Sequence, residues 1–207
     1  MSVTLPPQPI QLQGSAMARR VLGWLGWQLH FEGLPAAQGV IVVYPHTSNW
    51  DFPIGLLAKW AMGLDAKFLG KHTLFRIPLF GAWLRWLGGV SVDRSQAQGM
   101  VEQLVQVLKE HKAQNEHCWL VITPEGTRSW RPAWRSGFYR LARGAQVPLG
   151  LAVLDFGRKQ VRFVDFLTLS GDAEADMARI AQVYEGCAGC RPALAAPIRL
   201  NDNKEGA

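Results

Sequence analysis

Short apolar, β-branched runs alternate along this chain with segments in which apolar residues recur at helical spacing. This alternation is expected when helices cover a mostly parallel β-sheet, because parallel strands need long crossover connections that are usually helical. We therefore predict an α/β fold, with a single mostly parallel or mixed sheet flanked by helices and a short amphipathic N-terminal helix. The predicted strands are residues 40–44, 66–70, 89–92, 118–123, 147–154 and 161–166, and the predicted helices are residues 52–63, 74–87, 97–112, 136–144 and 173–185.

The 207 residues fit one main domain with short segments at its ends. Residues 1–16 have neither the basic start nor the apolar core of a signal peptide, so we expect a flexible arm. Residues 17–30 carry apolar side chains on one helical face, which predicts an amphipathic helix. This helix either lies in a membrane interface, with Trp24 and Trp27 at the depth of the head groups, or packs on the domain. The main domain is expected at residues 31–190, followed by a C-terminal tail at 191–207.

The composition favours a protein that lies on a membrane surface. Charged residues make up 18 % of the chain, whereas Trp and Phe each occur nine times. No apolar run reaches the roughly 18 to 20 residues that a spanning helix requires. The net charge is +6, and five arginines without an acid lie between Glu125 and Asp155. This basic zone suits anionic lipid or a phosphorylated substrate. No nucleic-acid recognition motif accompanies it, so we expect no nucleic-acid partner.

Three cysteines, Cys118, Cys187 and Cys190, are an odd number and indicate a reducing compartment. Cys187 and Cys190 form a CxxC pair. A tetrahedral zinc site would need two more ligands, and none lies nearby at the usual spacing, so no metal site is predicted.

The segment PHTSNWDF, residues 45–52, directly follows a predicted strand. Catalytic groups collect at the carboxyl ends of strands in open α/β sheets. A loop that enters a helix here, with Asp51 as its N-cap and Pro53 in its first turn, would let His46 and Asp51 face each other. The carboxylate would then fix one tautomer of the imidazole, and His46 could act as a general base. The alternative is that Asp51 only caps the helix and His46 is a loop residue.

A second polar block, TPEGTRSW at residues 123–130, also follows a predicted strand. Gly126 allows a close approach to the backbone, and Arg128 offers a planar fork for phosphate or carboxylate. Glu125 could bind a hydroxyl or pair with Arg128. An ordinary turn with a surface ion pair remains the alternative.

A third block, GGVSVDR at residues 88–94, is a short predicted strand that ends in Asp93 and Arg94. Asp93 could hold the guanidinium of Arg94 toward the same crevice. Three strand ends would then deliver polar groups to one edge of the sheet.

In order and spacing, these blocks, together with Val147 and Pro148 in a strand, resemble the motifs of the glycerolipid acyltransferase family, especially its bacterial PlsC-like members. The resemblance covers residues 40–150. It implies transfer of a fatty acyl group from acyl-CoA or acyl carrier protein, as a co-substrate, to a hydroxyl of a lysophospholipid such as 1-acylglycerol-3-phosphate. It implies no metal and no other cofactor, and the absence of a GxSxG motif speaks against a serine esterase.

The resemblance also assigns roles to single residues. His46 would be the base and Asp51 its partner, while the glycerol phosphate of the acceptor would be bound by Lys71, Arg94, Glu125, Gly126 and Arg128. Pro45 departs from the Asn that often precedes the His in this family, so any contact made by that Asn is absent.

Three points stay open at this stage. The acceptor could be another lysolipid or an amino-acid lipid. The chain could also be a non-catalytic module that binds anionic membranes through its basic zone and Trp residues. The apolar side chains of residues 74–87 could line a groove for the acyl chain or pack in the core. We expect a peripheral protein on the cytoplasmic face of the membrane.

Overall fold

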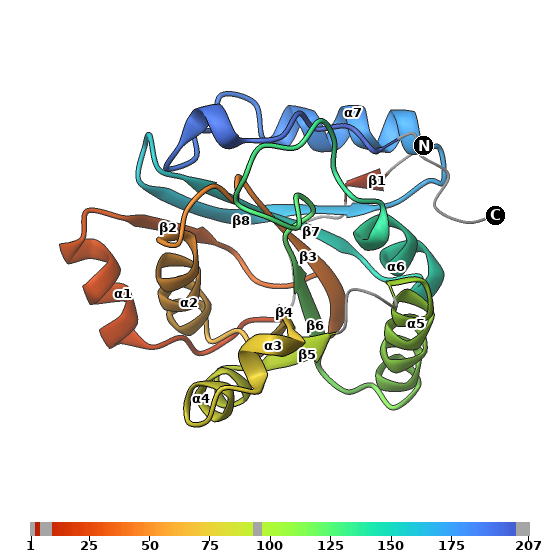
Figure 1. The fold of residues 1–207 in the computed structure, drawn as a ribbon, viewed down its shortest axis with the longest axis horizontal. Helices are drawn as coiled ribbons and strands as arrows, with labels where there is room; N and C mark the ends of the chain where they lie inside the picture. Colours follow the sequence, from red (N-terminus) through yellow and green to blue (C-terminus); the bar gives the residue numbers. More distant parts are fainter. Residues whose placement is uncertain (1–2, 5–9, 93–96, 202–207) are drawn as a thin grey trace.

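The structure, a computed structural model, describes residues 3–4, 10–92 and 97–201 (Figure 1). Its described strands form one mixed sheet in the order β1-β8-β7-β3-β6-β4-β5, with β2 paired to β8. Strands β7, β3, β6, β4 and β5 run parallel, and β8 runs antiparallel to β7. The strands are β1 (Val3–Thr4), β2 (Gln28–Phe31), β3 (Gln38–Tyr44), β4 (Ala66–Lys71), β5 (Gly89–Val92), β6 (Cys118–Ile122), β7 (Leu149–Asp155) and β8 (Gln160–Thr168).

Helices cover both faces of the sheet, as predicted (Figure 1). On one face, Val40 and Val42 of β3 belong to a core shared with Leu108, Phe138 and Ile180 from three helices. On the other face, Ile41 packs in a second core with helices near the N-terminus. The helices are α1 (Ala16–Trp24), α2 (Asp51–Met62), α3 (His72–Phe75), α4 (Phe80–Trp86), α5 (Ala97–Ala113), α6 (Gly137–Ala145) and α7 (Ala173–Val183), with a short 3-10 helix at Pro192–Leu194.

The burial of β3 explains the apolar run at residues 40–44. Six of its seven residues are buried, because a strand in the middle of a parallel sheet is covered on both faces. Each predicted strand and the single mixed sheet are confirmed, within one or two residues at most ends.

The segment predicted as one helix at residues 74–87 is two helices, so this prediction was wrong. Pro78 lies between α3 and α4, and a proline disfavours helical backbone at the residue before it. Leu79 then adopts a positive φ of 62°. The break turns α4 into a separate short helix on the molecular surface.

The amphipathic N-terminal helix is present but ends at Trp24, six residues before the predicted end. Ser15 caps its start by accepting a hydrogen bond from the N–H of Ala18. Gly26 has a φ of 78°, and residues 28–31 form β2 instead of helix. Trp27 is buried, so it does not lie at the depth of the head groups, as one of the two alternatives for this segment required.

Segments outside the predicted main domain also pack on the fold. Ile10 bridges to Leu34, and Leu200 bridges to Trp134. Two predictions fall partly outside the described residues: the flexible arm at residues 1–16 and the tail at residues 191–207. The prediction for Arg94 falls wholly outside them.

Candidate active site

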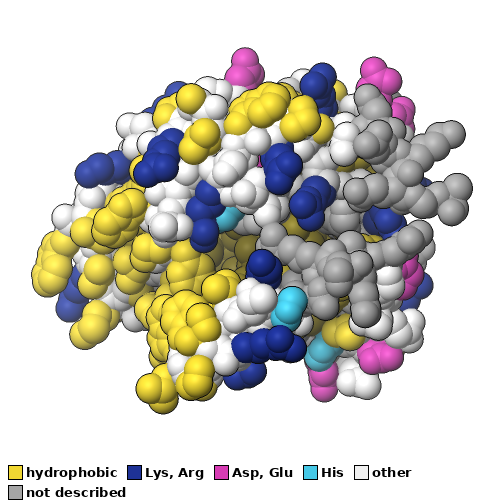
Figure 2. Space-filling view, viewed as in Figure 1, with side chains coloured by type: hydrophobic (Ala, Val, Ile, Leu, Met, Phe, Trp, Pro, Cys, Tyr) yellow, Lys and Arg dark blue, Asp and Glu magenta, His cyan; other side chains and the backbone are white. Residues whose placement is uncertain are grey.

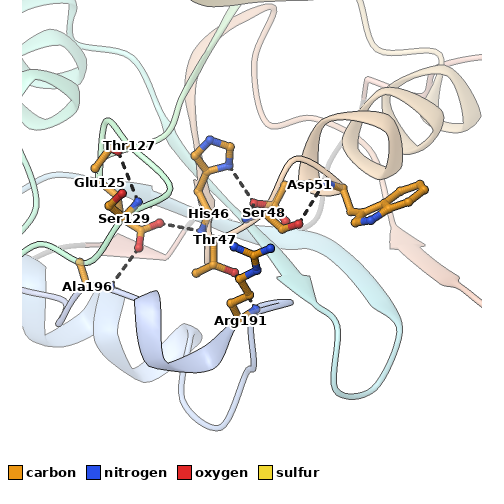
Figure 3. Close-up of polar contacts among 10 residues, drawn as sticks. His46, Thr47, Ser48, Asp51, Glu125, Thr127, Ser129, Arg191 and Ala196 are labelled. Atoms are coloured by element: carbon orange, nitrogen blue, oxygen red, sulfur yellow. Dashed lines mark hydrogen bonds and ion pairs between the residues drawn. The ribbon is translucent and has the colours of Figure 1, made fainter.

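His46 and Asp51 lie together at the carboxyl end of β3 (Figure 3). His46 Nδ1 is 3.0 Å from Asp51 Oδ2, and the two side chains are 15 % and 2 % exposed. The backbone N–H of Ser48 donates to the same carboxylate oxygen at 2.9 Å. With Nδ1 protonated and held by the carboxylate, the basic nitrogen of the ring is Nε2. The pairing predicted from the spacing of the two residues is therefore present.

Asp51 is the first residue of α2 and not its cap, which is Trp50. Its carboxylate accepts from the preceding loop, and its Oδ1 is buried without a hydrogen-bond partner among the described residues. The start of a helix carries partial positive charge, and an acidic side chain in the first turn interacts favourably with it. The local arrangement thus places the Asp51 carboxylate beside the His46 imidazole.

Glu125 is buried and lies beside the His46 loop (Figure 3). Its Oε2 accepts the backbone N–H of His46 at 2.6 Å, and its Oε1 accepts the backbone N–H of Ala196 at 2.9 Å. Burial raises the pKa of this carboxyl to about 7, although the two hydrogen bonds act against the rise. In this arrangement Glu125 joins three segments of chain, instead of offering an oxygen to a hydroxyl or to Arg128.

Lys71 and Arg128 lie at the same edge of the sheet as His46, and both side chains are exposed. Lys71 ends β4, and Arg128 follows β6 in the loop that begins at Thr123. Strands β3, β6 and β4 are parallel neighbours, so their carboxyl ends share one edge. No hydrogen bond or ion pair among the described residues connects either cation to His46, and Arg94 lies outside the described residues.

Gly126 has a φ of 66°, the left-handed backbone that favours glycine. A Cβ at this position would lie 2.9 Å from the Nε of Arg135. The space left by the missing side chain of Gly126 is therefore occupied by the side chain of Arg135. On the face of the molecule drawn in Figure 2, Lys and Arg side chains lie around a recessed centre.

The C-terminal segment also contributes to the site, which the sequence did not indicate. Thr47 Oγ1 accepts the backbone N–H of Arg191 at 3.1 Å, and the hydroxyl of Tyr44 donates to the carbonyl of Ala196 at 3.0 Å. These partners are separated by 144 and 152 residues in the chain. No local pattern near residue 190 signals such contacts, because they depend on where the chain returns after α7.

A separate groove lies apart from this site. This open groove of about 750 Å³ between α1 and the far end of α2 is lined in part by Met17, Val21, Trp60 and Leu64. The twelve residues of α2 separate it from Asp51 by about 18 Å.

In the described part of the chain, no three His, Cys, Asp or Glu side chains gather as metal ligands. Burial raises the pKa of the Cys187 thiol to about 11.

Comparison with known proteins identifies the family. An acyltransferase family model matches residues 27–150, more than half of the chain. The chain is 28 % identical over 139 residues to a 1-acyl-sn-glycerol-3-phosphate acyltransferase of Pseudomonas aeruginosa, an alignment that covers 65 % of this chain and 50 % of the relative. The chain thus spans about half the length of this curated relative.

The fold is also similar to a solved structure. The crystal structure of the 1-acyl-sn-glycerophosphate acyltransferase PlsC from Thermotoga maritima superimposes with a TM-score of 0.51 at 22 % identity, over 81 % of this chain and 73 % of that chain. At this identity the likeness supports the fold. The family-model match, which runs from β2 to the start of β7 and includes His46 and Asp51, shows that the chain belongs to the acyltransferase family.

Proposed function

We propose that this protein transfers a fatty acyl group from an acyl thioester to a hydroxyl of a lysophospholipid, with 1-acylglycerol-3-phosphate as the preferred acceptor and phosphatidic acid as the product. The observation that carries this proposal is the 3.0 Å contact between His46 Nδ1 and Asp51 Oδ2 at the carboxyl edge of the sheet. Family membership supports the acyl transfer, and the name of the Pseudomonas aeruginosa relative supports the acceptor.

His46 would act as a general base on the acceptor. The hydroxyl oxygen attacks the thioester carbonyl while Nε2 of His46 takes the hydroxyl proton. The resulting imidazolium is stabilised by Asp51, and its proton passes to the sulfur of the leaving thiolate when the tetrahedral intermediate collapses. A positioned general base typically contributes about 10² to 10⁴ in rate. No metal and no covalent enzyme intermediate is required by these steps.

Exposed cations at the same edge would bind the phosphate of the acceptor. Lys71 ends β4 and Arg128 lies in the loop after β6. In the sheet, β6 lies between β4 and the strand β3 that leads to His46, and Arg94 follows β5 in sequence. A guanidinium binds phosphate through two parallel hydrogen bonds, whereas an ammonium acts as a point charge. Holding the phosphate fixes the distance between the hydroxyl and Nε2, which is the geometric part of catalysis.

An exposed apolar surface supports peripheral membrane binding. Figure 2 shows apolar side chains gathered over the side of the molecule formed by α1, α2 and the α3 to α4 segment. Trp24 is 86 % exposed and Leu79 is 87 % exposed. We define this apolar surface by its exposed members Met17, Trp24, Trp60, Leu79, Phe80, Trp83 and Trp86.

Basic residues accompany this surface, as binding to anionic lipid requires. Arg20, Arg76 and Arg85 are exposed on α1, beside α3 and on α4. None of the helices in the described part of the chain has both the length and the apolar character needed to cross a bilayer. Binding on the cytoplasmic face would give access to acyl-CoA or acyl carrier protein.

Mass spectrometry of the lipid product tests the proposed reaction. The protein is supplied with acyl-CoA or acyl carrier protein as donor, and with 1-acylglycerol-3-phosphate, larger lysophospholipids or a hydroxyl-bearing amino-acid lipid as acceptor. We expect phosphatidic acid with the first acceptor and no product from His46→Ala. If product forms only with another acceptor, that lipid replaces 1-acylglycerol-3-phosphate as the proposed substrate. Binding to lipid without any product would indicate a non-catalytic module.

Flotation with vesicles that contain phosphatidylglycerol tests the membrane surface separately. The double variant Trp24→Ala/Trp86→Ala should bind about tenfold more weakly than the wild type, since burial of apolar area drives such binding. Val107→Ala removes an exposed apolar side chain from α5, outside the apolar surface, and serves as the matched control. Equal binding of all three proteins would contradict the assigned surface.

A further inference from the structure

The C-terminal segment at residues 187–196 lies against the loop that carries His46. This segment begins 37 residues after the end of the matched family model at residue 150, so the family motifs do not include it. It contacts the His46 loop through Thr47 and, by way of Glu125, through the backbone of His46 itself. Both contacts are drawn in Figure 3.

The first contact joins Arg191 to Thr47. Thr47 is 1 % exposed, and its hydroxyl accepts the backbone N–H of Arg191 at 3.1 Å. Gly189 packs on the same side chain so closely that a Cβ there would lie 2.6 Å from Thr47 Oγ1 and 3.1 Å from Pro45 Cβ. A real Cβ does not approach an oxygen to 2.6 Å, so the absence of a side chain at residue 189 permits this contact.

The second contact passes through Glu125. One carboxylate oxygen holds the N–H of His46 and the other holds the N–H of Ala196. The hydroxyl of Tyr44, which precedes the loop, donates to the carbonyl of Ala196 at 3.0 Å. The residues on both sides of the His46 side chain are thus tied to the same C-terminal segment.

We propose that residues 187–196 are a positioning element for the catalytic base, with Thr47, Glu125 and Gly189 as positioning residues. The inference rests on the proposed acyl transfer, because it assigns the segment a role in placing His46 Nε2 against the acceptor hydroxyl. A shift of about 1 Å in a reacting group can lower a rate about 100-fold. None of these contacts involves Lys71 or Arg128, so the binding of the acceptor should be affected less than its reaction.

Three variants isolate this element. Thr47→Val keeps the shape of the side chain and removes the acceptor for Arg191. Thr47→Ser keeps the hydroxyl that accepts the hydrogen bond from Arg191. Gly189→Ala pushes a methyl group into Thr47 and Pro45, whereas the control Gly99→Ala, on α5, places a methyl group where nothing lies within 4 Å.

Steady-state kinetics with saturating thioester donor, together with thermal unfolding, gives the first readout. We expect Thr47→Val and Gly189→Ala to lower kcat about tenfold with KM within about twofold of the wild type, Thr47→Ser to restore most of kcat, and Gly99→Ala to match the wild type. The proposal is overturned if Thr47→Val keeps kcat within about twofold, or if Thr47→Ser is as slow as Thr47→Val.

Hydrogen exchange gives a second readout that does not need activity. In Thr47→Val, peptides covering residues 45–51 and 187–196 should lose protection together, while those covering α5 should not. Unchanged exchange in both segments would overturn the inference. A wild-type protein that makes no acylated product would refute the proposed function instead, and coupled loss of protection would still establish the link between the two segments.

Discussion

Replacing Asp51 with Asn separates the charge of this residue from its hydrogen bonds. Both hydrogen-bonding contacts of the carboxylate, with His46 Nδ1 and with the N–H of Ser48, go to the single oxygen Oδ2. An Asn with its carbonyl oxygen in that place can accept both. Its NH2 group then occupies the buried position of Oδ1, which has no hydrogen-bond partner among the described residues. The substitution should therefore keep the geometry of the site and remove the negative charge.

The expected loss follows from the distance between the two groups. At 3.0 Å and an effective dielectric constant of about 20, two unit charges attract each other by about 5 kcal/mol. With the proton about half transferred in the transition state, about half of this attraction, near 3 kcal/mol, lowers the barrier. Because about 1.4 kcal/mol corresponds to a factor of ten, kcat of Asp51→Asn should fall about 100-fold.

Initial rates of lipid product formation, followed by mass spectrometry at saturating donor and acceptor, measure this loss. KM for the acceptor should change by less than about threefold, because Asp51 does not contact the phosphate-binding cations. Thermal unfolding of Asp51→Asn should show that the fold is intact. If Asp51→Asn retains kcat within about twofold while His46→Ala loses activity, stabilisation of the imidazolium by Asp51 is refuted.

Two further predictions concern buried carboxylates. Burial raises the pKa of Glu125 to about 7 from an ordinary value of 4.5. Its contribution to the free energy of unfolding is therefore fully present below about pH 4.5 and is lost as the pH rises through about 7. Urea unfolding should show the wild type losing about 3 kcal/mol relative to Glu125→Gln over this range, and parallel pH profiles would contradict this reasoning. Asp176 is 0 % exposed and accepts hydrogen bonds from Ser170, Gly171 and Tyr139. Asp176→Asn should lower the free energy of unfolding by about 2 kcal/mol at neutral pH, because an amide replaces one of the two acceptor oxygens with a donor. An unchanged midpoint in urea would show that these bonds contribute little.

Patterns within the sequence were sufficient to predict the sheet and the contact between His46 and Asp51. The strand at residues 40–44 and the helix beginning near residue 52 are local features, and five residues from His46 to Asp51 allow a loop that enters a helix. The spacing of strands and helices also predicted that Arg128 would lie at one edge with His46, whereas the place of Lys71 was implied by the family resemblance. These inferences hold because backbone hydrogen bonding and side-chain periodicity depend on neighbours in the chain.

The helix predictions from sequence spacing were wrong where a single residue changed the backbone conformation. The apolar spacing of residues 74–87 is typical of one helix, yet Pro78 and the positive φ of Leu79 divide it. The helix expected at residues 17–30 ends near Gly26, and the following residues join β8 as a strand. Pairing with a strand more than 130 residues away outweighed the weak helical preference of that segment.

The sequence by itself singled out the residues that we propose carry the chemistry, since His46, Asp51 and the basic residues occur in short blocks after strands. Only the tertiary structure decided what Glu125 does and that the C-terminal segment reaches the site. Glu125 has the same residue type whether it binds substrate or braces a loop. Its partners, His46 and Ala196, lie 79 and 71 residues away, and such pairings are set by the packing of the whole chain, which no local pattern encodes.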